Sequence, residues 1–212
     1  MCYSAESSIT SFIVGSSSCI YLLLSKNKYY KHIGLFLLFV VFIQLLEYFM
    51  WIDQKCGWLN NIASRSVNLI LGLQIYSIFL GGYMFNTLHI SKKYLMIILL
   101  LFTVALIYAI IYPFLDEDLI WCTKPNENNS LQWANHGIFY FEPYLTVLYY
   151  TSFLILPFLF KKLWMSLTLF IFGIITFVFT RYPNSYSSNS RWCYYSSFLP
   201  ILFVLLDYFK YK

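Results

Sequence analysis

Charged side chains are scarce in this chain. Lys and Arg total 14 and Asp and Glu total 9 of the 212 residues, so charged residues make up 11% of the chain, against about a quarter of an average soluble protein. Hydrophobic residues reach 60%, and 20 Tyr and 21 Phe are too many for one soluble core of this size to bury. The composition therefore predicts an integral membrane protein and excludes nucleic-acid binding, a disordered chain and a collagen-like repeat.

Seven apolar stretches are each long enough to cross a bilayer as a helix, which needs about 20 residues. They cover residues 7–24, 33–52, 67–85, 94–115, 138–160, 163–180 and 192–209. The first has no Lys or Arg before it and no A-x-A-like site after it, so we expect a span and not a cleaved signal peptide. The prediction is one all-α domain over residues 1–212, a polytopic membrane bundle of seven transmembrane helices.

Several catalytic signatures are missing as well. No lysine lies within a predicted span, which excludes a retinal Schiff base. His32 and His89 are predicted on the cytoplasmic side and His136 outside, so the three histidines cannot meet in a zinc site. The GxSxG, GxGxxG and P-loop patterns are also absent from the sequence. We therefore expect neither a metal nor a cofactor.

The basic residues predict the orientation. All 14 lie outside the predicted spans, nine on one side of the membrane and five on the other. The positive-inside bias places the nine in the cytoplasm, with the N-terminus outside and the C-terminus cytoplasmic. The net charge of +5 then indicates attraction to anionic lipid headgroups, and the lipid bilayer is the expected partner.

Four of the five cysteines are predicted on the same side of the membrane. Cys19 falls within the first span, where it is expected to pack as a small hydrophobe, whereas Cys2, Cys56, Cys122 and Cys193 all map to the outer side. Oxidising conditions there permit up to two disulfides in one of three pairings, and Cys56 and Cys122, both in outer loops, are the clearest candidates. The alternative of metal binding lacks a CxxC or HxxxH pattern.

The longest predicted loop, residues 116–137, lies outside. It contains Asn128-Asn129-Ser130, which matches an N-glycosylation sequon and makes Asn128 a candidate acceptor. A pattern of three residues also arises by chance, so the sequon is weak evidence.

Three acidic residues lie within the predicted spans: Glu47, Glu142 and Asp207. Glu47 and Glu142 are each predicted about 6–8 Å below the outer surface by helical rise, whereas Asp207, beside Lys210, is expected to be a solvated charge at the inner end. Because charges at bilayer depth are costly, they indicate a functional site. We predict an outward-facing polar pocket, whose candidate lining is Gln44, Glu47, Asn68, Gln74, His136 and Glu142. The alternative is that these side chains merely hydrogen-bond between neighbouring helices.

Three segments carry distinctive motifs: the opening MCYSAESS, the Q-x-x-E-x-x-x-W pattern of residues 44–51, and WCY at residues 192–194. They resemble a family of uncharacterised multi-pass membrane proteins from bacteria and large DNA viruses, in which the matching segments are MCFSAxAS, a Q-x-x-E-x-x-x-W stretch in the second span, and WCF. Tyr3, Ser7 and Tyr194 depart from the family's pattern. The resemblance implies a multi-pass membrane protein without naming an activity, in a host or viral membrane if the chain is viral and in the plasma membrane if it is bacterial.

The resemblance also brings Cys2 and Cys193 together, since both belong to matching segments near the outer ends of the first and last spans. It therefore favours a Cys2–Cys193 bridge beside Cys56–Cys122. A rival hypothesis makes Cys2 a nucleophile, activated at a helix N-terminus after removal of Met1.

Two function classes follow. The first is a membrane component that binds or passes a small or lipidic ligand through the outward pocket. The alternative is an intramembrane lipid-modifying enzyme with Glu47 or Glu142 as acid/base and His136 nearby. An enzyme requires a nucleophile, a metal or a second base within hydrogen-bond reach of a carboxylate, whereas a binder requires only a concave polar pocket.

Overall fold

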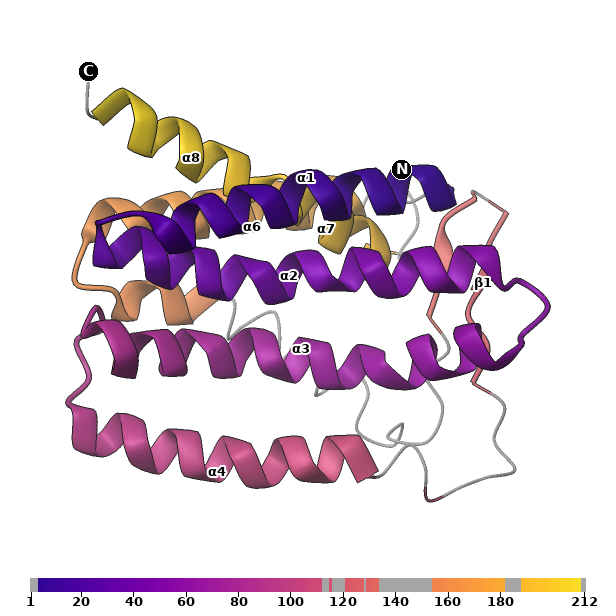
Figure 1. The fold of residues 1–212 in the computed structure, drawn as a ribbon, viewed down its shortest axis with the longest axis horizontal. Helices are drawn as coiled ribbons and strands as arrows, with labels where there is room; N and C mark the ends of the chain where they lie inside the picture. Colours follow the sequence, from indigo (N-terminus) through magenta and orange to yellow (C-terminus); the bar gives the residue numbers. More distant parts are fainter. Residues whose placement is uncertain are drawn as a thin grey trace.

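The computed structural model describes residues 4–111, 115, 121–127, 129–133, 154–181 and 188–210. Helices α1 to α4 lie side by side in chain order, and α6 to α8 lie on the α1 and α2 side of that layer (Figure 1). The helices are α1 (Ala5–Leu24), α2 (Lys28–Ile52), α3 (Trp58–Phe85), α4 (Lys92–Ile111), the short 3-10 helix η3 (Leu156–Leu159), α6 (Leu163–Arg181), α7 (Ser188–Ser196) and α8 (Leu199–Lys210). The strands β1 (Lys124–Pro125) and β2 (Leu131–Gln132) form one hairpin.

The all-α prediction is confirmed for the described residues. Five helical segments are long and apolar enough to cross a membrane: α1, α2, α3, residues 163–180 of α6, and residues 190–209, which cover most of α7 and α8. Helix α4 has 20 residues, with its charges confined to Lys92 and Lys93. The predicted span 138–160 lies mostly outside the described residues.

Predicted and observed helices agree best at their C-terminal ends. Helices α1, α2 and α3 end at Leu24, Ile52 and Phe85, as predicted. Helix α2 begins at Lys28, five residues before the predicted span, because Asn27 caps it by accepting a hydrogen bond from the Tyr29 N–H (3.0 Å). A prediction from apolar length leaves out the polar residues at the start of a helix, here residues 28–32 of α2.

The last predicted span, 192–209, is two helices in the structure. Helix α7 ends at Ser196, and α8 starts at Leu199 with Pro200 in its first turn. A proline inside one continuous helix would have no N–H for the Ser196 carbonyl group, whereas it is tolerated in a first turn. The helix therefore breaks ahead of Pro200.

Helices α1 and α2 pack closely at their glycines. A Cβ on Gly34 would lie 2.9 Å from the Cys19 carbonyl oxygen, and one on Gly15 would lie 2.8 Å from a methyl group of Val41. Small residues allow such close approach between helices in a membrane. Cys19 is fully buried in this contact, as predicted for a small hydrophobe.

Candidate functional site

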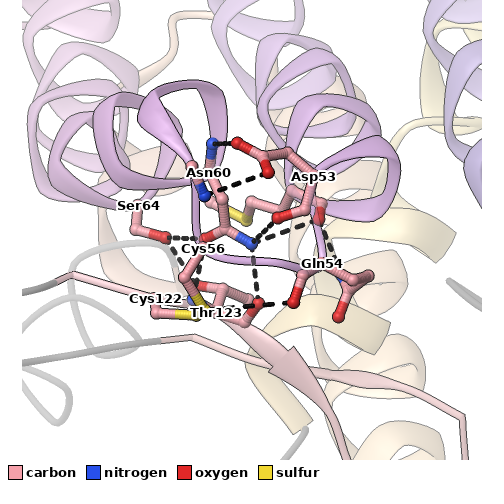
Figure 2. The surroundings of a disulfide bond; sticks show 9 residues. Asp53, Gln54, Cys56, Asn60, Ser64, Cys122 and Thr123 are labelled. Atoms are coloured by element: carbon pink, nitrogen blue, oxygen red, sulfur yellow. Dashed lines mark hydrogen bonds between the residues drawn. A yellow bond between two sulfur atoms is a disulfide. The ribbon is translucent and has the colours of Figure 1, made fainter.

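Residues 121–127 and 129–133 pack against the C-terminal end of α2 and the N-terminal end of α3, and we call them the cap. In this cap the two strands pair antiparallel, with Lys124 opposite Gln132. The predicted Cys56–Cys122 pairing is present as a disulfide, which joins the cap to the loop after α2 (Figure 2). The cap is thus covalently fixed to the α2–α3 connection across 66 residues of sequence.

Asn60, a buried residue in the first turn of α3, makes most of the polar contacts beneath the cap (Figure 2). Its side-chain oxygen accepts a hydrogen bond from the Thr123 N–H (2.9 Å). Its side-chain nitrogen donates to three backbone carbonyl oxygens, those of Met50 (3.2 Å), Asp53 (3.0 Å) and Thr123 (2.9 Å). Ser64, one turn later, reaches the Thr123 hydroxyl (2.8 Å). One amide therefore bonds to the end of α2 and to the cap.

The predicted pair Gln44 and Glu47 lies deeper in the bundle, on one face of α2. Both side chains are fully buried, and Gln44 Nε2 donates to Glu47 Oε2 (2.9 Å). On the other side of the pair, Ser11 of α1 donates to Gln44 Oε1 (3.0 Å). The shared face expected from the i, i+3 spacing is confirmed.

Trp133, directly after β2, links the cap to this pair. Its indole Nε1 donates to Glu47 Oε1 (3.1 Å), so each carboxylate oxygen of Glu47 accepts a hydrogen bond. Glu47 lies five residues before the end of α2 at Ile52, which is about 8 Å along the helix axis. A hydrogen-bonded chain therefore runs from α1 through α2 to the cap. We call Ser11, Gln44, Glu47 and Trp133 the carboxylate chain.

Cys193 is a buried free thiol on α7, the helix that packs against α2. The predicted Cys2–Cys193 bridge is therefore not formed, because Cys193 faces the bundle interior and not the outer surface. Cys2, with its proposed role as nucleophile, lies outside the described residues.

The other predicted pocket residues are not brought together with Glu47 in the structure. Gln74 is buried but donates to the Phe39 carbonyl oxygen (3.3 Å), and Phe39 lies eight residues, about 12 Å, along α2 from Glu47. Asn68 is half-buried on α3. The remaining predicted site residues lie outside the described residues: His136, Glu142 and the sequon residue Asn128.

The expectation of a solvated Asp207 is wrong. Asp207 is 4% exposed, and its Oδ2 accepts a hydrogen bond from the Ser25 hydroxyl (3.3 Å). Helix α8 packs against α1, so the side chain is enclosed although it is close to the end of the chain. Sequence position near a terminus gave no information about this packing.

Five residues of the site were not predicted: Ser11, Asn60, Ser64, Thr123 and Trp133. Ser11 belongs to a serine-rich helix, and Asn60 and Ser64 precede the predicted third span, so no pattern assigned them to a polar pocket. Trp133 contacts a residue 86 positions earlier in the sequence, and this is a tertiary contact that spacing cannot reveal.

At the carboxylate chain, the Glu47 carboxylate can accept hydrogen bonds or pair with a cation. A buried carboxylate is stable where donors satisfy it, and a hydrogen bond to a charged group contributes about 1.5–3 kcal/mol. Among the described residues, no group of three or more His, Cys, Asp or Glu side chains is placed to hold a metal ion. No protein-family model, curated protein or solved structure matches this chain.

Proposed function

We propose that this chain is a seven-span membrane protein that binds or passes a small or lipidic ligand at its exoplasmic end, with Glu47 as the ligand's acceptor. The five candidate spans support the architecture, α4 has the length of a sixth, and residues 138–160 would supply the seventh. The resemblance to the family of bacteria and large DNA viruses likewise implies a multi-pass membrane protein, without giving the number of spans.

Two observations support an outward-facing N-terminus and a cytoplasmic C-terminus. Helix α1 begins at the end of the bundle that carries the cap, and α8 runs toward the opposite end (Figure 1). The cap carries the Cys56–Cys122 disulfide, and disulfides persist on the oxidising side of a membrane.

The observation that carries the ligand proposal is the Trp133–Glu47 hydrogen bond. The indole donor comes from the cap, while the carboxylate belongs to a helix in the bundle. A ligand at this position would compete with the Trp133 indole for Glu47 Oε1. A ligand that competes for this position needs an ammonium, amine or hydroxyl donor, and an ammonium group suits a carboxylate best.

The test uses ethanolamine as the probe and ethylene glycol as its uncharged analogue. We expect ethanolamine to raise the thermal unfolding midpoint of the purified chain, because a ligand that binds the folded state stabilises it. Glu47→Gln should abolish this shift. Trp133→Phe should lower the ethanolamine concentration needed, because it removes the competing donor and leaves an aromatic ring. An equal shift with ethylene glycol, or an unchanged response in Glu47→Gln, contradicts the proposal.

A further inference from the structure

Lysines surround the helix starts at the end of the bundle opposite the cap. Lys28 is the first residue of α2, Lys92 the first of α4, and Lys161 and Lys162 directly precede α6. The first turns of these three helices contain no acidic residue, whereas α1, which begins at the cap end, has Glu6 there. A cation near a helix N-terminus is unfavourable, because the helix dipole is already positive at that end.

Two of these ammonium groups meet at one backbone oxygen, and a third shares an aromatic ring with one of them. The Nζ atoms of Lys28 and Lys161 lie 3.5 and 3.3 Å from the same Asn86 carbonyl oxygen, so they are within about 7 Å of each other. Lys161 Nζ also donates to Asn86 Oδ1 (2.9 Å). The Nζ atoms of Lys28 and Lys162 both lie over the Tyr29 ring, at 5.5 and 5.7 Å from its centroid. We call Lys28, Lys161, Lys162 and Asn86 the lysine cluster.

The backbone holds these side chains together. Leu88 and Phe160 form an isolated antiparallel bridge, flanked by hydrogen bonds from the Lys161 N–H to the Thr87 carbonyl oxygen (2.9 Å) and from the His89 N–H to that of Leu159 (2.7 Å). The segment before α6 is therefore fixed against the end of α3. The convergence of the lysines follows from the fold and not from chance rotamers of isolated surface residues.

The cluster carries a net positive charge. Asn86 caps the C-terminus of α3, and a helix C-terminus supplies about half a negative charge against three ammonium groups. Asp207 adds one acidic group at this end of the bundle, where it is 4% exposed and accepts a hydrogen bond from Ser25. Tyr29 and Tyr83 border the cluster, with Lys92 over the Tyr83 ring (5.6 Å), and aromatic residues of this kind gather at the level of lipid headgroups. An anion bound here would be at headgroup depth.

From this geometry we infer that the lysine cluster binds the phosphate group of an anionic phospholipid. A phosphodiester carries one negative charge and several acceptor oxygens, which matches converging ammonium donors next to helix N-termini. The membrane-level aromatic residues favour a lipid over soluble phosphate. The proposed topology decides only which leaflet of the membrane the lysine cluster faces. The cluster lies at the opposite end of the bundle from the cap, so the inference does not depend on Glu47 as a ligand acceptor.

The test measures lipid binding to the full-length chain in detergent micelles by native mass spectrometry, with phosphatidylglycerol as the probe and phosphatidylcholine as the neutral reference. Lys28→Gln/Lys161→Gln should weaken phosphatidylglycerol binding about 30-fold, since each lysine contributes about 1 kcal/mol. The matched control is Lys26→Gln/Lys93→Gln, which makes the same charge change at two exposed lysines at the same end of the bundle. It should change the affinity less than 3-fold.

Equal losses in the two double variants would overturn the site, because they would indicate diffuse charge attraction. Millimolar inorganic phosphate that displaces phosphatidylglycerol would overturn the choice of a lipid. If the double variant does not fold, phosphatidylglycerol binding is measured with Lys162→Gln instead, because the Lys162 ammonium group lies over the Tyr29 ring of the cluster. That variant should fold and bind phosphatidylglycerol about 5-fold more weakly, and unchanged binding would contradict the inference. None of these outcomes depends on ethanolamine or Glu47.

Discussion

The hydrogen bond between Trp133 and Glu47 can be tested through folding stability. Trp133→Phe retains an aromatic ring in the buried position and removes the indole N–H that donates to Glu47 Oε1. A hydrogen bond to a charged group contributes about 1.5–3 kcal/mol, and the carboxylate oxygen left behind stays buried. We expect Trp133→Phe to lower the free energy of unfolding by about 2 kcal/mol, or the unfolding midpoint by about 4–8 °C for a chain of this length.

Trp51 provides a matched control for this substitution. It lies one turn after Glu47 on α2, and its buried Nε1 has no hydrogen-bond partner among the described residues. Trp51→Phe makes the same chemical change but removes no hydrogen bond, so it should alter the unfolding free energy by less than about 1 kcal/mol. Similar losses in the two variants would mean that ring size, and not the hydrogen bond, determines stability.

A double-mutant cycle isolates the interaction itself. Glu47→Gln retains an acceptor but removes the charge, so Trp133→Phe should cost about 1 kcal/mol less in the Glu47→Gln background than in the wild type. The measurement is equilibrium unfolding of the four purified proteins in mixed micelles. Additive effects of the two substitutions would refute the reasoning, because they would show that the two side chains do not interact.

Three further predictions concern other contacts. Gly81→Ala should destabilise the protein by about 1–3 kcal/mol in equilibrium unfolding, since the added Cβ would lie 2.6 Å from Nε2 of the buried His32. Asn60→Ala should cost about 3 kcal/mol and expose the cap to protease, because it removes the hydrogen bonds that join α3 to the end of α2 and to the cap. Reduction of Cys56–Cys122 should lower the unfolding free energy by roughly 4 kcal/mol, given the 66-residue separation, and thiol counting without reductant should find both cysteines blocked.

Apolar length was sufficient to predict an all-α chain with helices long enough to cross a membrane. The ends of α1, α2 and α3 and the side-by-side placement of Gln44 and Glu47 follow directly from runs of apolar residues and from helical spacing. The start of α3 at Trp58 did not follow, because its first turns contain Asn60 and Ser64, which pair with the cap and not with lipid.

Contacts between distant segments limited the prediction of the site. Cys193 was expected at the outer surface and is buried in the bundle, and Asp207 was expected in solvent and is enclosed against α1. Both errors come from reading depth along one helix, which gives no information about the face that packs inward. Trp133 shows the same limit, since its donor role depends on the fold of the cap.

The most direct test of the proposed exoplasmic site is the side from which position 47 can be reached. The measurement uses Glu47→Cys in a chain with Cys2, Cys19 and Cys193 replaced by serine, sealed in vesicles and exposed to an impermeant cationic thiol reagent. We predict slow reaction from the exoplasmic side, at least ten-fold faster when Trp133→Ala loosens the cap, and no reaction from the cytoplasmic side. Reaction from the cytoplasmic side, or none from either side with Trp133→Ala, would contradict the account.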